Sequence, residues 1–193
     1  YDENGRPICI ENADQSRTKI VYDRQGNIVS ICDAGGVRAS YQYDSLNRVT
    51  GTTDGNGNTT IFEYNYADKI QKVTNPLGAE RSYTYNESGK VTEVTDYDGK
   101  KVGAVYNELG KISSIIDKEG NITSYAYDAM WNICQVTQAD GGIIHYRYDG
   151  NNRLYEEQLP DGGSIQYTYD GNGNRINYLY NERPYSTSKT WYP

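Results

Sequence analysis

The sequence has few of the residues that build an ordinary core. Among 193 residues it has one phenylalanine, one methionine and one histidine, and only 36% of its residues are hydrophobic. A two-sheet sandwich needs two continuous aliphatic inner faces, so this composition disfavours that fold. We expect the single histidine, His145, to be a surface residue, because no second histidine and no cysteine accompanies it in a metal-site or catalytic pattern.

Other absences restrict the classes of function. The formal net charge is −7, whereas nucleic-acid-binding surfaces are normally basic, so we expect no nucleic-acid partner. No apolar run approaches the roughly 18 residues of a membrane span. No nucleophile–base pair, metal-ligand cluster or phosphate-binding loop stands out, so we expect no enzyme activity, no metal and no cofactor.

What the sequence has in excess is tyrosine and glycine, with 21 and 20 residues. A tyrosine followed by Asp or Asn, which we call the anchor tyrosine, recurs every 21 residues without an insertion. A fixed period of this length indicates a repeat architecture. The anchor tyrosines are Tyr1, Tyr22, Tyr43, Tyr64, Tyr85, Tyr106, Tyr127, Tyr148 and Tyr169.

Each repeat is expected to be one β-hairpin followed by a turn into the next. Four residues after the anchor stands a Gly, Asn or Asp in every repeat but one, and these residues tolerate a left-handed backbone. Asp or Asn three places before such a residue is typical of a type I turn that closes a three-residue hairpin loop. A second turn of the same kind, such as Asp96 to Gly99, ends the repeat. No helix is required.

The spacing of apolar residues predicts one β-bulge in every repeat. In the hairpin closed by Asn86 and Lys90, both Val91 and Val94 belong on the face that carries Tyr85. Their odd spacing contradicts simple alternation. One extra residue near Thr92 resolves the conflict, and bulges add curvature. The fold class is therefore all-β: an antiparallel meander of repeated hairpins, wound as a single-layer curved sheet with its tyrosine face inward.

Three aromatic residues in turns are candidates for ligand stacking, because 14 of the 21 tyrosines are in phase with the ladder and are needed for packing, which leaves only off-phase aromatic residues as candidates. They are Tyr66, Tyr97 and Trp131. Trp131 stands where the other repeats have Gly, Asn or Asp, and a left-handed Trp is strained. We therefore expect a different turn there, with the Trp ring packed on its neighbour; the alternative is an exposed apolar anchor.

Charged and polar residues at the turns have structural interpretations. A basic or amide residue follows the first turn in each repeat, for example Arg48, and it faces an Asp or Asn such as Asp44 across the hairpin. We expect these to be ion pairs of under about 1 kcal/mol each and not a groove for a polyanion. The segments 54–58 and 170–174 resemble the start of a calcium loop but lack its distal Glu and the Gly at its sixth position, so we expect ordinary turns.

The repeat pattern predicts where the array ends and whether the cysteines can pair. Residues 1–175 are expected to form eight full 21-residue units plus part of a ninth, and residues 176–193 to form a degenerate terminal or capping segment. Equivalent strands of neighbouring repeats are about 10 Å apart, too far for a disulfide. We therefore expect Cys9, Cys32 and Cys134 to be unpaired.

The repeat Tyr-x-Tyr-Asp/Asn-x-x-Gly resembles the YD repeat of the rearrangement-hotspot (Rhs) family; residues 41–57 and 125–141 follow it with Asn47 and Trp131 at the Gly position. The resemblance covers residues 1 to about 175. It implies a segment of a hollow β-shell of the kind found in bacterial polymorphic toxins, wall-associated proteins, insecticidal toxin complexes and teneurins. In the toxins the shell encloses a C-terminal toxic domain. The family's closing Asp-Pro-x-Gly self-cleavage motif does not occur here.

Two functions remain open from the sequence. The first is a non-catalytic wall segment of an encapsulating or cell-surface shell, in a larger secreted bacterial toxin or adhesin whose targeting signal lies outside this segment. Its partners would be the remainder of the shell and an enclosed C-terminal toxin domain. Roughly eighteen strands span only about 86 Å, too little to enclose such a domain alone, so we expect exposed sheet edges to self-associate. The second is a carbohydrate-binding module that uses the turn aromatics.

Overall fold

The computed structural model describes residues 1–182. Within this range the chain forms seventeen β-strands joined by short turns, and it contains no helix. Consequently no helix in residues 1–182 is long and apolar enough to cross a membrane. The all-β fold expected from the 21-residue period is confirmed.

The chain divides into two units, Tyr1–Lys101 and Val102–Pro193. The strands of the first unit are β1 (Cys9–Glu11), β2 (Arg17–Tyr22), β3 (Ile28–Asp33), β4 (Gly36–Tyr43), β5 (Val49–Asp54), β6 (Thr59–Tyr64), β7 (Ile70–Thr74), β8 (Glu80–Tyr85) and β9 (Val91–Thr95). The strands that follow are β10 (Lys101–Tyr106), β11 (Ile112–Ile116), β12 (Ile122–Tyr127), β13 (Ile133–Thr137), β14 (Ile143–Tyr148), β15 (Leu154–Gln158), β16 (Ser164–Tyr169) and β17 (Arg175–Asn181).

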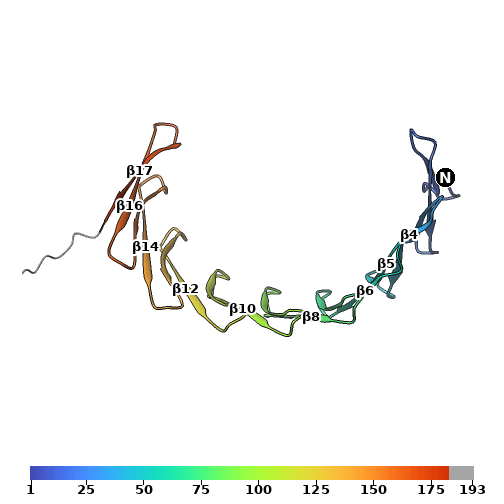
Figure 1. The fold of residues 1–193 in the computed structure, drawn as a ribbon, viewed down its shortest axis with the longest axis horizontal. Coiled ribbons are helices and arrows are strands. Elements are labelled where there is room, and N and C mark those ends of the chain that lie inside the picture. Colours follow the sequence, from blue (N-terminus) through green and yellow to red (C-terminus); the bar gives the residue numbers. More distant parts are fainter. Residues whose placement is uncertain (183–193) are drawn as a thin grey trace, which may run out of the picture. The chain divides into compact units, whose positions relative to one another are not determined.

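Within each unit the strands form an antiparallel meander in chain order (Figure 1). Among the described residues of a unit, each strand contacts only the strand before it and the strand after it. Within the described part of each unit, no second layer of strands or helices therefore covers either face of the sheet. This is the single-layer arrangement that the low content of aliphatic residues predicts.

The hairpin turns have the predicted chemistry. In the turn after β8 the Gly89 N–H donates to the carbonyl of Asn86 at 2.9 Å, and the Asn86 N–H donates to the carbonyl of Lys90 at 2.9 Å. Gly89 has a φ of 73°, a left-handed conformation that glycine adopts without steric cost. The Asn86 side chain closes the turn further by accepting the Lys90 N–H at 2.9 Å.

The predicted bulge is present in the eight repeats that begin at Tyr22 and the later anchors. Between β8 and β9 Tyr85 pairs with Val91 and Thr84 pairs with Glu93, so Thr92 is the extra residue. Tyr83 pairs with Val94, which places Val91 and Val94 together on the tyrosine face as expected. The same shift occurs in seven other hairpins, those that follow the anchors Tyr22, Tyr43, Tyr64, Tyr106, Tyr127, Tyr148 and Tyr169. The pair β3–β4 has one further shift, next to Cys32.

The hydroxyl groups of the anchor tyrosines connect successive repeats, which the sequence pattern does not reveal. Seven of them donate to a backbone carbonyl fifteen residues earlier, and in every one of these bonds except that of Tyr22 the carbonyl belongs to the residue just before the extra residue of a bulge. The bond therefore satisfies a polar group where the strand ladder is interrupted. The bonds run from Tyr22 to Pro7, Tyr43 to Ile28, Tyr64 to Val49, Tyr85 to Ile70, Tyr127 to Ile112, Tyr148 to Ile133 and Tyr169 to Leu154, at 2.6–3.1 Å.

The apolar core is thin. Among the described residues Val73 is the one buried hydrophobic residue, and no large side chain is fully buried. The anchor tyrosines Tyr43, Tyr85 and Tyr148 are half-buried, and burial raises the pKa of each hydroxyl. Tyrosine suits this position because it provides a large apolar ring and a hydroxyl that needs a hydrogen-bond partner.

The expectation of a different turn at Trp131 is wrong. Trp131 has a φ of 67°, and its N–H donates to the carbonyl of Asp128 at 3.1 Å, as the Gly, Asn or Asp does at this position of the other repeats. The hydrogen bonds of the turn, including those to the Asp128 carboxylate from the Met130 and Asn132 amides, therefore hold a tryptophan in the left-handed region. The Trp131 residue is 45% exposed.

This conformation predicts that replacing Trp131 by glycine stabilises the protein. A left-handed residue with a Cβ costs about 1–2 kcal/mol, so we expect Trp131→Gly to raise the free energy of unfolding by about 1 kcal/mol. Equilibrium urea unfolding measures the change. Asn152→Gly at the equivalent position is the control, because asparagine tolerates this conformation; an equal gain from both substitutions would contradict the assignment of strain to Trp131.

The predicted division of the chain into an array and a terminal segment is tested only in part. The boundary at residue 175 stays a prediction, since β17 begins at Arg175 and pairs with β16 up to Asn181. Residues 183–193, which include most of the segment expected to be degenerate, lie outside the described residues.

The cysteines Cys9, Cys32 and Cys134 are free thiols, as predicted from the distance between equivalent strands.

Candidate functional site

Two of the three turn aromatics, Tyr66 and Tyr97, do not form one platform. Tyr66 lies in the turn between β6 and β7 and is completely exposed. Tyr97 lies in the turn after β9, which the meander places at the opposite end of the strands. Trp131 belongs to the second unit. A role of these residues in stacking on a ligand stays a prediction.

Tyr97 is already engaged within the protein. The Arg81 guanidinium lies over its ring at 4.6 Å from the centroid, and Arg81 also forms an ion pair of 2.6 Å with Asp96. A sugar that stacked on the covered face of Tyr97 would have to displace this cation. Tyr97 is therefore the weakest of the three candidates.

The basic residues after the first turn have the structural role expected of them. Arg48 forms an ion pair of 2.7 Å with Asp44, across its own hairpin. It also lies over the ring of Tyr64, the next anchor tyrosine, at 4.6 Å. This second contact links neighbouring repeats and was not predicted. Equivalent cation–π contacts join Arg6 to Tyr22, Lys111 to Tyr127 and Arg153 to Tyr169.

The aspartates of the turns are occupied by the turns themselves. In the calcium-like segment 54–58 the Asp54 carboxylate accepts the N–H groups of Asn56 and Asn58, and the side-chain amide of Asn58, each at 2.9 Å. The side-chain and backbone hydrogen bonds of Asn58 lower the pKa of Asp54 below 3.8. No group of three metal-ligating side chains occurs among residues 1–182.

The structure instead reveals a group of long polar side chains on the face opposite the tyrosines, which we call the polar patch. It covers strands β13 to β16. The register pairs Gln135 with His145, His145 with Gln158, and Arg147 with Glu156. The patch consists of Gln135, His145, Arg147, Tyr155, Glu156 and Gln158.

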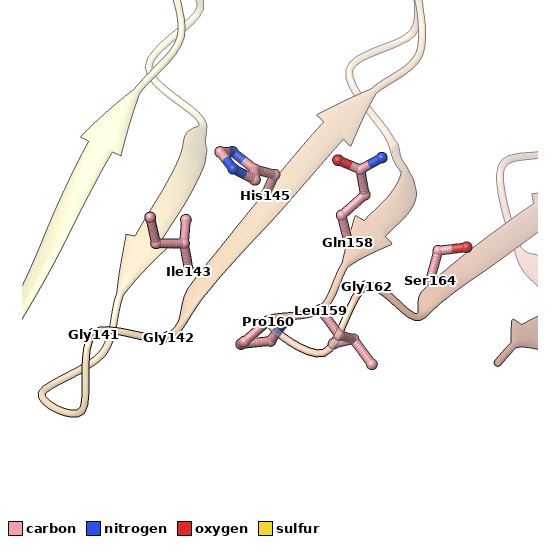
Figure 2. Close-up of a pocket in the computed structure, with 9 residues that line it drawn as sticks. All are labelled: Gly141, Gly142, Ile143, His145, Gln158, Leu159, Pro160, Gly162 and Ser164. Carbon is pink, nitrogen blue, oxygen red and sulfur yellow. The ribbon is translucent and has the colours of Figure 1, made fainter. Parts of the chain in front are cut away.

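The polar patch lines a shallow groove. Its larger part has a volume of about 560 Å³ and is bordered by His145, Gln158 and Ser164, with Pro160 in the adjoining turn. Figure 2 shows His145, Gln158 and Ser164 side by side on β14, β15 and β16. A second part of about 390 Å³ shares His145 and Gln158 and continues to Gln135 and Arg147.

One ion pair anchors the patch. The Arg147 guanidinium lies 2.9 Å from the Glu156 carboxylate. The side chain of Glu156 is only 11% exposed, whereas that of Arg147 is 54% exposed. Glu156 also accepts a hydrogen bond from the amide of Gln166 at 3.3 Å. A nearly buried carboxylate is stable when it is paired and hydrogen-bonded in this way.

The geometry of the patch does not support catalysis by a serine–histidine pair. His145 and Ser164 lie on β14 and β16, with Gln158 of β15 between them. Two strand spacings are about 10 Å, whereas a nucleophile and its base must be within hydrogen-bond reach. The arrangement offers hydrogen-bonding groups to a ligand and lacks an activated nucleophile.

The tyrosine face also carries an unusual residue next to the patch. Glu157 pairs with Tyr146 and Ile165, at a position where the repeat pattern predicts an aliphatic residue. The Tyr167 hydroxyl donates to Glu157 at 2.6 Å. This hydrogen bond, together with burial, raises the pKa of Tyr167 to about 12. The carboxylate is therefore accommodated by a tyrosine hydroxyl and not by a cation.

Sequence reasoning missed the polar patch because it considered His145 alone. A signal was present in the alignment of the repeats with one another. The residues equivalent to His145 are mostly small or aliphatic, and threonine is the commonest residue among those equivalent to Gln158. At the position of His145 the other repeats have Lys19, Ser40, Ile61, Ser82, Gly103, Ser124 and Gln166, and at that of Gln158 they have Glu11, Cys32, Thr53, Thr74, Thr95, Ile116, Thr137 and Leu179.

Comparisons with known proteins agree with the repeat architecture. The family model described as RHS Repeat matches residues 22–59, 64–101 and 106–143, whereas no curated protein matches the chain. The crystal structure of TcdB2-TccC3-Cdc42 is similar with a TM-score of 0.73 and 14% identity, over 92% of this chain and 11% of that chain. The crystal structure of TcdB2-TccC3 is similar with a TM-score of 0.68 and 12% identity, over 93% and 12%.

A third similar structure is a mutant of the Photorhabdus luminescens Tc holotoxin pore. Its TM-score is 0.63 at 15% identity, over 86% of this chain and 11% of that chain. The chain therefore spans about a ninth of the length of the structures that it matches. At these identities the likeness concerns the fold.

Proposed function

Because the chain belongs to the RHS repeat family, we propose that it forms a section of the wall of a hollow β-shell in a larger secreted or cell-surface protein. Its role in that wall is structural and not catalytic. The remainder of the shell continues the same sheet, and the enclosed cargo is a C-terminal toxin domain of the kind that the family resemblance implies.

The observation that carries this proposal is the connection between repeats by side chains of the tyrosine face. The Tyr64 hydroxyl reaches the Val49 carbonyl of the preceding repeat at 2.7 Å, while Arg48 lies over the Tyr64 ring. A single-layer sheet without a second layer needs such links to keep its strands in register. It thus stays continuous while both of its faces remain accessible, one to the cargo and the other to the surroundings.

Limited proteolysis of the full-length protein that contains this chain tests the proposal. We expect the cargo to resist a protease that digests it rapidly after denaturation. Replacing Tyr43 and Tyr64 by alanine removes two of the links and should open the wall, so that the cargo becomes digestible under native conditions. The control is Tyr66→Ala, which changes a wholly exposed turn residue. If the cargo of the unmodified protein is cleaved as fast under native conditions as after denaturation, the wall function is contradicted.

A further inference from the structure

Arginines of this chain contact a carboxylate and a tyrosine ring at the same time. Arg48 forms its ion pair with Asp44 at 2.7 Å and lies 4.6 Å from the centroid of the Tyr64 ring. A guanidinium can make both contacts because it is planar: its flat face stacks on a ring while the donors at its edge bind a carboxylate. Three further arginines make the same two contacts, namely Arg6 with Asp2 and Tyr22, Arg81 with Asp96 and Tyr97, and Arg153 with Asp149 and Tyr169.

Glu157 is a carboxylate of the tyrosine face that lacks such an arginine. Within residues 1–182 it forms no ion pair, and its hydrogen bond comes from the neutral Tyr167 hydroxyl at 2.6 Å. Placing a carboxylate on a half-buried face without a cation costs free energy, and the other repeats form the same strand without one. At the position of Glu157 they have Ile31, Thr52, Val73, Val94, Ile115, Val136 and Tyr178.

Arg175 lies on the same face but does not supply the missing cation. Its guanidinium lies over the Tyr167 ring, 5.1 Å from the centroid. Arg175 belongs to β17 and Glu157 to β15, with β16 between them, and two strand spacings are about 10 Å. A carboxylate has about four acceptor positions, and the Tyr167 hydroxyl occupies one of them. Glu157 therefore keeps acceptor capacity for a donor from outside the described chain.

Tyr146 supplies the aromatic ring beside this carboxylate. It pairs directly with Glu157 across β14 and β15, which puts the two Cβ atoms about 5 Å apart. Burial and then the nearby Glu157 charge raise the pKa of the Tyr146 hydroxyl. The residue is only half-buried, so part of it can be reached from the open face. Glu157 and Tyr146 thus reproduce the carboxylate and the ring that surround Arg48, without the arginine.

We propose that Glu157 and Tyr146 bind an arginine side chain of a second protein segment that lies against the tyrosine face. The guanidinium pairs with the carboxylate and stacks on the ring. A lysine ammonium fits less well because it is not planar and cannot do both, and a calcium ion needs about six or more oxygen ligands. The net charge of −7 favours the approach of a basic segment.

The source of this arginine follows from the wall function. If the tyrosine face is turned to the interior of a shell, the segment belongs to the enclosed cargo, and this assignment of the partner rests on the proposed function. The arginine site itself does not, because it is formed by side chains of this chain alone.

Fluorescence anisotropy with a labelled peptide of three arginines separated by glycines tests the site at about 50 mM salt, where charge interactions are weakly screened. We expect Glu157→Gln to weaken binding about tenfold, because hydrogen bonds to a charged group are lost. Glutamine keeps the size of the side chain and still accepts the Tyr167 hydroxyl. The matched control is Glu108→Gln, which changes the net charge equally at an exposed turn position of the same unit and is expected to weaken binding less than about twofold.

Two further peptides separate recognition of arginine from general attraction, and they need no variant. In one, lysine replaces each arginine; in the other, citrulline supplies a neutral side chain of the same shape. We expect the arginine peptide to bind more tightly than the lysine peptide, and the citrulline peptide not to bind. Tyr146→Leu, which removes the ring and keeps an apolar side chain, should reduce the preference for arginine over lysine.

Three results would overturn the proposal. They are no saturable binding of the arginine peptide up to about 1 mM, equal affinities for the arginine and lysine peptides, and equal losses in Glu157→Gln and Glu108→Gln. The peptide titration uses no cargo, whereas proteolysis of the full-length protein does. Failure of the arginine site therefore leaves the wall function standing, and a cargo that is digested under native conditions leaves the arginine site standing.

Discussion

Replacing Tyr85 by alanine is expected to lower the free energy of unfolding by about 3 kcal/mol, at the low end of the range for aromatic-to-alanine changes in cores. The ring of Tyr85 is half-buried on the tyrosine face, where it pairs with Val91. Its hydroxyl donates to the Ile70 carbonyl at 2.6 Å. The substitution removes both the ring and the bond between repeats. Equilibrium urea unfolding measures the loss.

Two further variants separate the contributions. Tyr85→Phe keeps the ring and leaves the Ile70 carbonyl without its donor, so we expect a loss of about 1 kcal/mol. Tyr66→Ala, at a wholly exposed position, should change the free energy of unfolding by less than about 0.5 kcal/mol. Equal losses at Tyr85 and Tyr66 would show that the anchor tyrosines do not stabilise the sheet.

The fold was predictable because two independent patterns agree in the sequence. The 21-residue period indicates the repeat, and the turn residues give the hairpins. The bulge follows from a conflict between the hairpin pairing and simple alternation: Val91 and Val94 must share a face although their positions differ by three, an odd number. Such a conflict has few solutions in an antiparallel pair, so the sequence alone predicts an extra residue near Thr92.

The contacts between repeats and the polar patch were not predictable in the same way. The target of a tyrosine hydroxyl depends on which carbonyl the bulge leaves exposed, and that requires the three-dimensional course of two neighbouring hairpins. The patch depends on the register of four strands, since His145 and Gln158 are thirteen positions apart in the chain yet face each other. Trp131 was misjudged because intrinsic preference alone was considered, whereas the hydrogen bonds of the turn determine its conformation.

Acid is expected to destabilise the protein steeply below about pH 4. Hydrogen bonds from the side chain and then the backbone amide of the residue four positions later lower the pKa of Asp54, Asp117 and Asp170 below 3.8. A carboxylate whose pKa is lower in the folded state stabilises it above pH 3.8, and this stabilisation disappears as the pH falls through the lowered pKa. We therefore expect a constant urea midpoint from pH 7 to about pH 5, and a progressive decrease below about pH 4.

Replacing these three aspartates by asparagine should reduce the decrease. The chain itself shows that asparagine holds the same turn, since the Asn75 side chain accepts the N–H groups of Leu77 and Ala79 at 3.0 and 2.9 Å. An amide does not titrate in this range, so the variant loses three of the groups that respond to acid. Other turn aspartates with a lowered pKa, such as Asp44 and Asp149, keep part of the response. If the triple variant and the unmodified chain lose stability in parallel between pH 5 and pH 2, the turn carboxylates are not the cause of acid unfolding.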